Sequence, residues 1–123
     1  GLEERPPALF RPVGVQEVLA DPVSGTTRYQ VMPPLEEGTV RIERLVAPPG
    51  ASALSLPPVG AGAVLTVAVC HGRLNVRMDE HRWSVGEGDS VTLRGPAEVV
   101  VEPFPGELGV AYLVTARRLS DGG

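Results

Sequence analysis

The segment that decides the fold is Gly72-Arg73-Leu74-Asn75-Val76, followed by Trp83-Ser84-Val85-Gly86-Glu87-Gly88-Asp89-Ser90-Val91-Thr92-Leu93. In both parts, apolar residues alternate with polar ones. This period of two predicts β-strands with one packed face and one face in water. Glycines lie between the alternating runs, where tight turns need backbone conformations that other residues avoid. The segment therefore predicts a β-hairpin followed directly by another strand.

The same alternation extends in both directions from this segment and covers residues 39–116. The apolar positions of the eight alternating runs are Val40 and Ile42; Leu54 and Leu56; Val67 and Val69; Leu74, Val76 and Met78; Trp83 and Val85; Val91 and Leu93; Val99 and Val101; and Val110, Tyr112 and Val114. Gly and Pro stand at nearly every joint between them. About eight short strands spaced in this way predict an all-β sandwich or barrel and exclude a helical fold.

The 123 residues are enough for one domain with one core. Residues 1–38 are rich in proline and predict an N-terminal arm, with a short helical turn within 14–20 and a short strand over 28–32. Residues 39–116 form the predicted barrel, and residues 117–123 a polar, frayed tail. The chain begins at Gly1 without a methionine, so we interpret it as a trimmed product or a piece of something longer.

Composition excludes several functional classes. Hydrophobic residues make up 42% of the chain but aromatic residues only 4%, which predicts an aliphatic interior and disfavours stacking on sugar rings. The net charge is −4 and the 11 basic residues, all Arg, are scattered, so no nucleic-acid partner is expected. No apolar run approaches the roughly 18 residues of a membrane span, so no membrane association is expected.

Cysteine usage and the N-terminal sequence bear on the cellular compartment. Cys70 is the only cysteine, so no internal disulfide can form and no oxidising compartment is required. The chain also lacks the pattern of a secretory signal peptide. We therefore expect a cytoplasmic protein.

The order of strand, glycine, alternating strand, hairpin, Gly-Asp and alternating strand resembles the cupin superfamily, from Gly50 to about Val101. The resemblance implies a double-stranded β-helix, the cupin jelly roll, of about eight strands. Gly50, Gly72, Gly88 and Asp89 would then be structural motif residues. Gly88 and Asp89 are interpreted as support for a turn rather than as catalytic residues, because this carboxylate has no acid or base partner at suitable spacing.

The resemblance also implies where metal ligands would stand in a metal-binding relative. Counted from Gly50, the two histidine positions of the first motif fall on Leu56 and Pro58, and the glutamate position falls within 60–62. The histidine position of the second motif, counted from Gly88, falls on Val99. None of these residues can bind a metal ion, so we expect no metal site and no cofactor in this chain.

A ligand pocket without a metal remains open, and its candidate residues are Arg41, His71, Trp83 and Tyr112. Arg41 lies on an alternating strand, where it either joins a solvated charged face or points along a ligand groove. Trp83 is in phase with Val85 and is expected in the core or at the barrel mouth. His71 and His81 lie at opposite ends of one predicted strand, too far apart to share a metal ion. No catalytic residue is identified.

Within the superfamily, about two thirds of the chain resembles the C-terminal jelly roll of type I phosphomannose (mannose-6-phosphate) isomerases. In these enzymes zinc belongs to the N-terminal cupin, so the resemblance implies a parent that catalyses aldose-ketose isomerisation of a sugar phosphate. This chain would be a non-catalytic module of that parent. Its partner would be the parent's own N-terminal catalytic part, with a homodimer as a further expectation.

Two alternatives from other functional classes stay open. The first is a stand-alone, metal-free cupin used for oligomerisation or for binding a small ligand. The second is a metal-free cupin enzyme that acts on a sugar or a sugar nucleotide, with an interior Arg, Tyr or His as the acid or base. Because one fold hosts many functions, the sequence resemblance does not decide among the three hypotheses.

Overall fold

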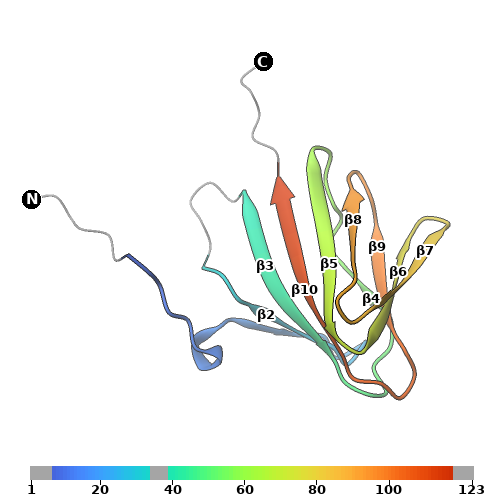
Figure 1. Cartoon of the computed structure of the whole chain (residues 1–123), viewed down its shortest axis with the longest axis horizontal. Coiled ribbons are helices and arrows are strands. Elements are labelled where there is room, and N and C mark those ends of the chain that lie inside the picture. The colour runs from blue at the N-terminus through green and yellow to red at the C-terminus, as the bar shows by residue number, and fades with distance from the viewer. Residues whose placement is uncertain (1–6, 34–38, 118–123) are drawn as a thin grey trace, which may run out of the picture.

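The protein is described by a computed structural model that covers residues 7–33 and 39–117. Its strands form two antiparallel sheets, as Figure 1 shows. The six-stranded sheet has the order β1 (Val18–Ala20), β2 (Thr27–Gln30), β3 (Val40–Ala47), β10 (Gly109–Arg117), β5 (Ala63–His71) and β8 (Ser90–Arg94). The four-stranded sheet has the order β4 (Leu54–Ser55), β9 (Val99–Pro103), β6 (Arg73–Met78) and β7 (His81–Gly86).

All eight predicted strands are present as β3 to β10, so the all-β prediction is confirmed. The N-terminal arm adds two more strands. β2 corresponds to the short strand expected over 28–32, whereas the expected helical turn within 14–20 is a 3-10 turn, η1, at Val13–Val15, followed by β1. Both arm strands belong to the six-stranded sheet because β2 pairs with β3. Of the predicted tail, Arg117 ends β10 and residues 118–123 lie outside the described part.

The core between the sheets is aliphatic, as the composition predicted. The largest fully buried side chains come from both sheets and are Leu45, Leu74, Leu113, Val67, Val76, Val99 and Val101. Trp83 is only partly buried and packs against this cluster. Burial of these branched side chains, each contributing about 1.5–3 kcal/mol, is the main stabilising term for the barrel.

Two strands bury the opposite face from the one their alternation suggested. Val40 and Ile42 of β3 were expected inside, but the buried side chains of this strand are Glu43, Leu45 and Ala47. In β10, likewise, Leu113 is buried, whereas Tyr112 is 37% exposed. The physical reason is that both strands carry apolar residues on both faces, and alternation alone then leaves the inward face undefined.

The described residues offer no membrane-spanning element of the helical kind: no helix among them has the length and the apolar character to cross a bilayer.

Candidate functional site

The motif glycines lie in turns between strands of the barrel. Gly72, between β5 and β6, has φ 70°, and a Cβ at this position would collide with the carbonyl oxygen of Leu108. Gly88 has φ 84°, and the neighbouring Asp89 Oδ2 accepts a hydrogen bond from the backbone N–H of Gly86 at 3.2 Å. Gly50 also has positive φ, 88°. These four motif positions therefore shape turns, and the carboxylate of Asp89 is engaged with the backbone.

The positions at which metal ligands would stand in a metal-binding relative come together in the fold. The backbone N–H of Leu56 donates a hydrogen bond to the carbonyl oxygen of Val99 at 2.9 Å, so the two motifs meet side by side. Leu56 and Val99 are 8% and 1% exposed, and both belong to the aliphatic core. Within residues 7–33 and 39–117, no group of three or more His, Cys, Asp or Glu side chains is placed to hold a metal ion.

Beside Leu56, a cavity of about 490 Å³ opens at one end of the barrel. It lies between the six-stranded sheet and the segment 56–60 that leads toward β5. Its wall is formed by Arg11, Glu17, Gln30, Met32, Pro33, Thr39, Val40, Arg41, Glu43, Leu56, Pro57, Pro58, Val59, Gly60, Ala63, Leu65, Leu113, Thr115 and Arg117. The arm, the sheet and the 56–60 segment all contribute, so the cavity exists only once the arm has paired with β3.

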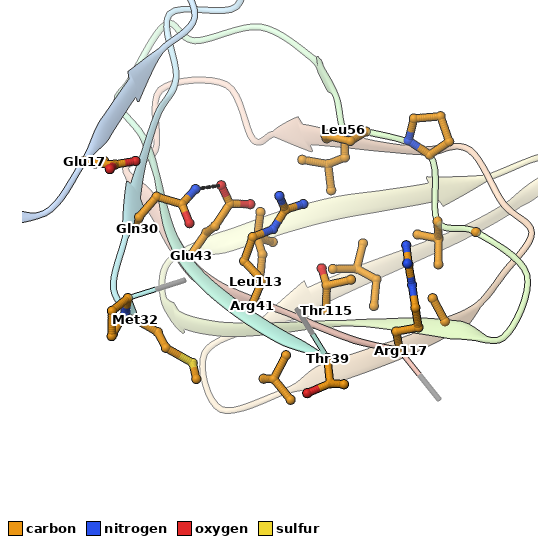
Figure 2. Close-up of a pocket in the computed structure, with 18 of the residues that line it drawn as sticks. Glu17, Gln30, Met32, Thr39, Arg41, Glu43, Leu56, Leu113, Thr115 and Arg117 are labelled. Carbon is orange, nitrogen blue, oxygen red and sulfur yellow. Dashed lines mark hydrogen bonds between the residues drawn. The ribbon is translucent and has the colours of Figure 1, made fainter. Parts of the chain in front are cut away.

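Two arginines from different strands contribute cationic groups to this cavity, whose wall also carries the carboxylates of Glu17 and Glu43. Figure 2 shows the guanidinium groups of Arg41, from β3, and Arg117, from β10, both extending toward the segment that carries Leu56. The hydroxyl of Thr115 lies between them. In the described residues, no ion pair within 4.0 Å involves either arginine. The cavity therefore presents cationic hydrogen-bond donors next to an aliphatic wall.

The carboxylate of Glu43 belongs to a fixed network on the arm side of the cavity. Glu43 is 4% exposed, and its Oε2 accepts a hydrogen bond from Gln30 Nε2 at 2.5 Å, drawn as the dashed line in Figure 2. Its Oε1 lies 3.5 Å from Arg28 Nη1. A buried carboxylate needs such partners to offset its lost hydration. Glu43 therefore links β2 to β3 and holds the cavity wall next to Arg41 in place.

A further arginine of the wall contributes a donor that lacks a partner. The Nε of Arg11 is buried and has no hydrogen-bond partner within the described ranges. Buried polar groups are nearly always paired, and an unpaired one often marks a place where a ligand or water supplies the partner. Arg11 thus adds to the cationic character of the cavity.

The four residues proposed from the sequence for a ligand pocket do not gather in one place. Arg41 lines the cavity, whereas the other three lie elsewhere. His71 ends β5, is largely exposed, and has its Nδ1 3.5 Å from Glu87 Oε1. The ring of Trp83 stacks on that of His81 at a centroid distance of 5.8 Å. Tyr112 lies on the outer side of the six-stranded sheet.

Sequence reasoning missed the partners of Arg41 in this cavity. Gln30 and Glu43 face inward from β2 and β3, while Thr115 and Arg117 face inward from β10. The signal that could have found them is the phase of β3 and β10, because residues 41 and 43, and residues 113, 115 and 117, each share one face of a strand. That phase becomes visible only when the pairing of the two strands is known.

Comparison with known proteins bears on the fold. No protein-family model matches the chain, and no curated protein matches it. Among solved structures, the chain is similar to the Cupin_2 domain of an XRE family transcriptional regulator from Enterobacter cloacae, with 16% identity and TM-score 0.69 over 76% of this chain and 98% of that one. It is also similar to a Cupin 2 conserved barrel domain protein from Salinispora arenicola, with 21% identity and TM-score 0.66 over 89% and 88%.

A third similar structure is that of KdgF from a Halomonas species, with 13% identity and TM-score 0.62 over 87% of this chain and 93% of that one. At these identities the likeness concerns the fold alone. The chain has a cupin fold, so the predicted cupin jelly roll is confirmed. The finer resemblance to phosphomannose isomerases finds no support in these neighbours.

Proposed function

We propose that this protein is a metal-free cupin domain that binds a small anionic molecule, a carboxylate or a phosphate ester, in the cavity lined by Arg41 and Arg117. The observation that carries the proposal is that two guanidinium groups from separate strands extend into one cavity of about 490 Å³. Small-molecule sites commonly measure roughly 300–1,000 Å³ and combine apolar walls with a few convergent polar groups. This cavity has that size and that composition.

The chemistry of the wall supports an anion with an apolar part. Guanidinium groups bind carboxylate and phosphate oxygens through paired hydrogen bonds, which are stronger than neutral ones. Leu65 and Leu113 of the same wall offer aliphatic surface to the rest of the ligand. Binding of this kind uses side-chain donors only, so it needs neither a metal ion nor another cofactor.

The proposal is for binding and not for catalysis. The one buried carboxylate of the cavity, Glu43, is engaged by Arg28 and Gln30. The histidines are not part of the wall, and neither is Cys70. A nucleophile within hydrogen-bond distance of a base, which covalent catalysis requires, is not present among the residues that the structure describes around this cavity.

Isothermal titration calorimetry tests the proposal with gluconate, hexanoate and glucose 6-phosphate as probes. We expect at least one of them to bind the wild-type chain, with an affinity that falls as salt is added. Arg41→Gln should raise the dissociation constant at least about tenfold, because a charge-assisted hydrogen bond is lost. Arg82→Gln, an exposed arginine on the outer side of the four-stranded sheet, is the matched control and should bind like wild type.

Two outcomes would overturn the proposal: equal binding by wild type and Arg41→Gln, or no binding of any probe. The titration is repeated with a chelator, which should leave the affinity unchanged. Dependence on an added divalent metal would contradict the metal-free mode.

The isomerase-module hypothesis keeps only its sequence support, and no observation in the structure favours it over a stand-alone domain. Its partner, the N-terminal catalytic part of a parent chain with zinc there, stays a prediction, as does the cytoplasmic location. The hypothesis of a metal-free enzyme acting on a sugar nucleotide predicts turnover at the same cavity. An assay that detects turnover abolished by Arg41→Gln would favour it over simple binding.

A further inference from the structure

The outer face of the six-stranded sheet, the side turned away from the core, is mostly apolar over its three central strands. The strand register defines this face, because residues directly opposite each other in antiparallel strands point to the same side. Its apolar members on β3, β5 and β10 are Val40, Ile42, Val46, Val64, Ala68, Val110, Tyr112, Val114 and Ala116. Apart from the partly exposed Tyr112, they are half-buried, although none contributes to the core.

These residues form continuous rows across the three central strands. One row runs from Ile42 to Val114 to Thr66. The next runs from Val40 to Ala116 to Val64. Cβ atoms of directly opposed residues lie about 5 Å apart, so the side chains touch across the strands. The result is one contiguous apolar surface and not a scatter of single exposed residues, which would need no explanation.

No described element covers this surface. The four-stranded sheet packs against the other face, where the core lies. In Figure 1 the strands β3, β10 and β5 run side by side, and β9, β6 and β7 of the four-stranded sheet lie to their right. The segments outside the description are 1–6, 34–38 and 118–123, and each contains a single large apolar residue, a leucine.

We infer that this face is the interface with a second copy of the chain. The strands β2, β3, β10, β5 and β8 have four, eight, nine, nine and five residues, and at ~4.8 Å spacing and ~3.3 Å rise per residue they span roughly 550 Å². A biological interface buries at least about 1,000 Å² in total, or about 500 Å² per partner, so the face is large enough for a dimer. Two twisted sheets pack face to face about 10 Å apart with their side chains interdigitated.

The charges of the face are compatible with its pairing to an identical face. The described part of the surface carries no carboxylate, and its row from Ile42 through Val114 and Thr66 to Thr92 carries no charge. Arg94 lies opposite Val64 on the edge strand β8 of this surface. Arg44 projects from it, but its guanidinium carbon lies 4.6 Å from the centre of the Tyr29 ring, so the cation has a partner within the same chain. Thr66 and Thr92 satisfy each other through a hydrogen bond of 2.8 Å. A neutral aliphatic centre can face its own copy without bringing like charges together at the middle of the interface.

The N-terminal arm extends the same surface. Val18 of β1 pairs with Tyr29 and so continues the outer face to the edge of the sheet. Ahead of it along the chain, Leu9 and Phe10 are 69% and 89% exposed. Large apolar side chains so exposed on an edge strand and the segment before it are typical of chain-to-chain contact. An arm of this kind would reach a second copy stacked on the same face.

Sedimentation equilibrium of the purified chain tests the inference. We expect wild type to be a dimer, and Val114→Glu at the centre of the face to raise the dimer dissociation constant at least about a hundredfold, because an unpaired carboxylate would be buried. Ile42→Glu, on the neighbouring strand, should act in the same way. The matched control is Ser84→Glu, which places the same charge on the outer face of the four-stranded sheet and should leave the dimer intact.

Circular dichroism checks that each variant keeps its β-structure. If Val114→Glu does not fold, Ile42→Glu takes its place as the test. A monomeric wild type would overturn the inference and leave the face for a different protein or another part of a longer chain. A dimer that survives both Val114→Glu and Ile42→Glu would place the interface elsewhere and overturn it too. The result is independent of ligand binding, because neither residue faces the interior of the barrel.

Discussion

The two sheets share one core but present opposite surfaces to their surroundings. On the four-stranded sheet the outward residues of β6 are polar, and two of them form ion pairs. Arg77 Nη1 lies 3.1 Å from Glu102 Oε1, and Arg73 Nη2 lies 2.9 Å from Glu107 Oε1. On the six-stranded sheet the outward positions of β3, β5 and β10 are mostly aliphatic, and polar side chains are concentrated on the edge strand β8. One outer face is therefore chemically suited to water and the other to a protein surface.

This difference between the two outer faces explains why some strands of the barrel do not alternate strictly between apolar and polar residues. A strand with one wet face alternates strictly, whereas a strand buried on both faces is a nearly continuous apolar run. β6 follows the first pattern. β5, with the sequence AVLTVAVCH, follows the second, although only one of its faces meets the core in a single chain. The contrast teaches that an apolar run in a barrel of this kind can report an interface as well as a core.

The largest expected effect separates the inner from the outer face of one strand. Leu113 is 2% exposed and lies in the core, so Leu113→Ala should lower the free energy of unfolding by about 2–5 kcal/mol. Val114→Ala, one residue further on, should cost less than about 1.5 kcal/mol, because its side chain is only half-buried in the single chain. Urea denaturation of monomeric protein measures both. Equal losses would mean that the outer face is packed within the chain.

A gentler change to the outer face should affect association without affecting folding. The double variant Ile42→Thr, Val114→Thr keeps β-branched side chains, which suit strands, but adds two hydroxyl groups. We expect the dimer dissociation constant to rise at least about tenfold, while the free energy of unfolding of the monomer stays within about 1 kcal/mol of the wild-type value. Size-exclusion chromatography with light scattering and urea denaturation provide the two values. A large loss of monomer stability would show that the outer face contributes to folding of the single chain, which contradicts the proposed difference between the two faces.

On the polar face, removing an ion pair should change little. Arg77 and Glu102 have side chains that are 40% and 27% exposed, so water screens their attraction. Arg77→Ala should therefore lower the free energy of unfolding by no more than about 1 kcal/mol, and added salt should reduce that difference. The oligomeric state should not change. Dissociation of the dimer in Arg77→Ala would show that the four-stranded sheet takes part in the interface.

The smallest effect concerns pH. The hydrogen bond from Arg73 lowers the pKa of the Glu107 carboxyl below its ordinary value of 4.5. A carboxyl whose pKa is lowered by folding stabilises the fold above its unfolded pKa, and this contribution is lost as pH falls through the folded value. The melting temperatures of wild type and Glu107→Gln should therefore become more similar as the pH drops below 4.5. The effect should be slight because the pair is exposed. A difference in melting temperature that grows as the pH falls would contradict the prediction.

Much of the fold could be predicted from local sequence. The eight strands of the barrel and the turns at Gly72 and Gly88 follow from alternation and from the conformational freedom of glycine. The candidate site was less predictable. Arg41 was proposed, yet Arg117 and Thr115 were missed, because only the pairing of β10 with β3 shows that they share a face with it. The cavity also needs the arm strand β2, whose position across from β3 no local signal encodes.

The sequence by itself determined that this chain is a β-barrel with an aliphatic core and no metal ligands at the cupin motif positions, because side-chain chemistry and a period of two are properties of single segments. Only the tertiary structure decided which face of β3 and β10 turns inward. Both faces of these strands carry apolar residues, so burial alone does not choose between them. The choice is made by strand pairing and by the partners that Glu43 finds on β2, and it places Arg41 in the cavity and Val114 on the outer face.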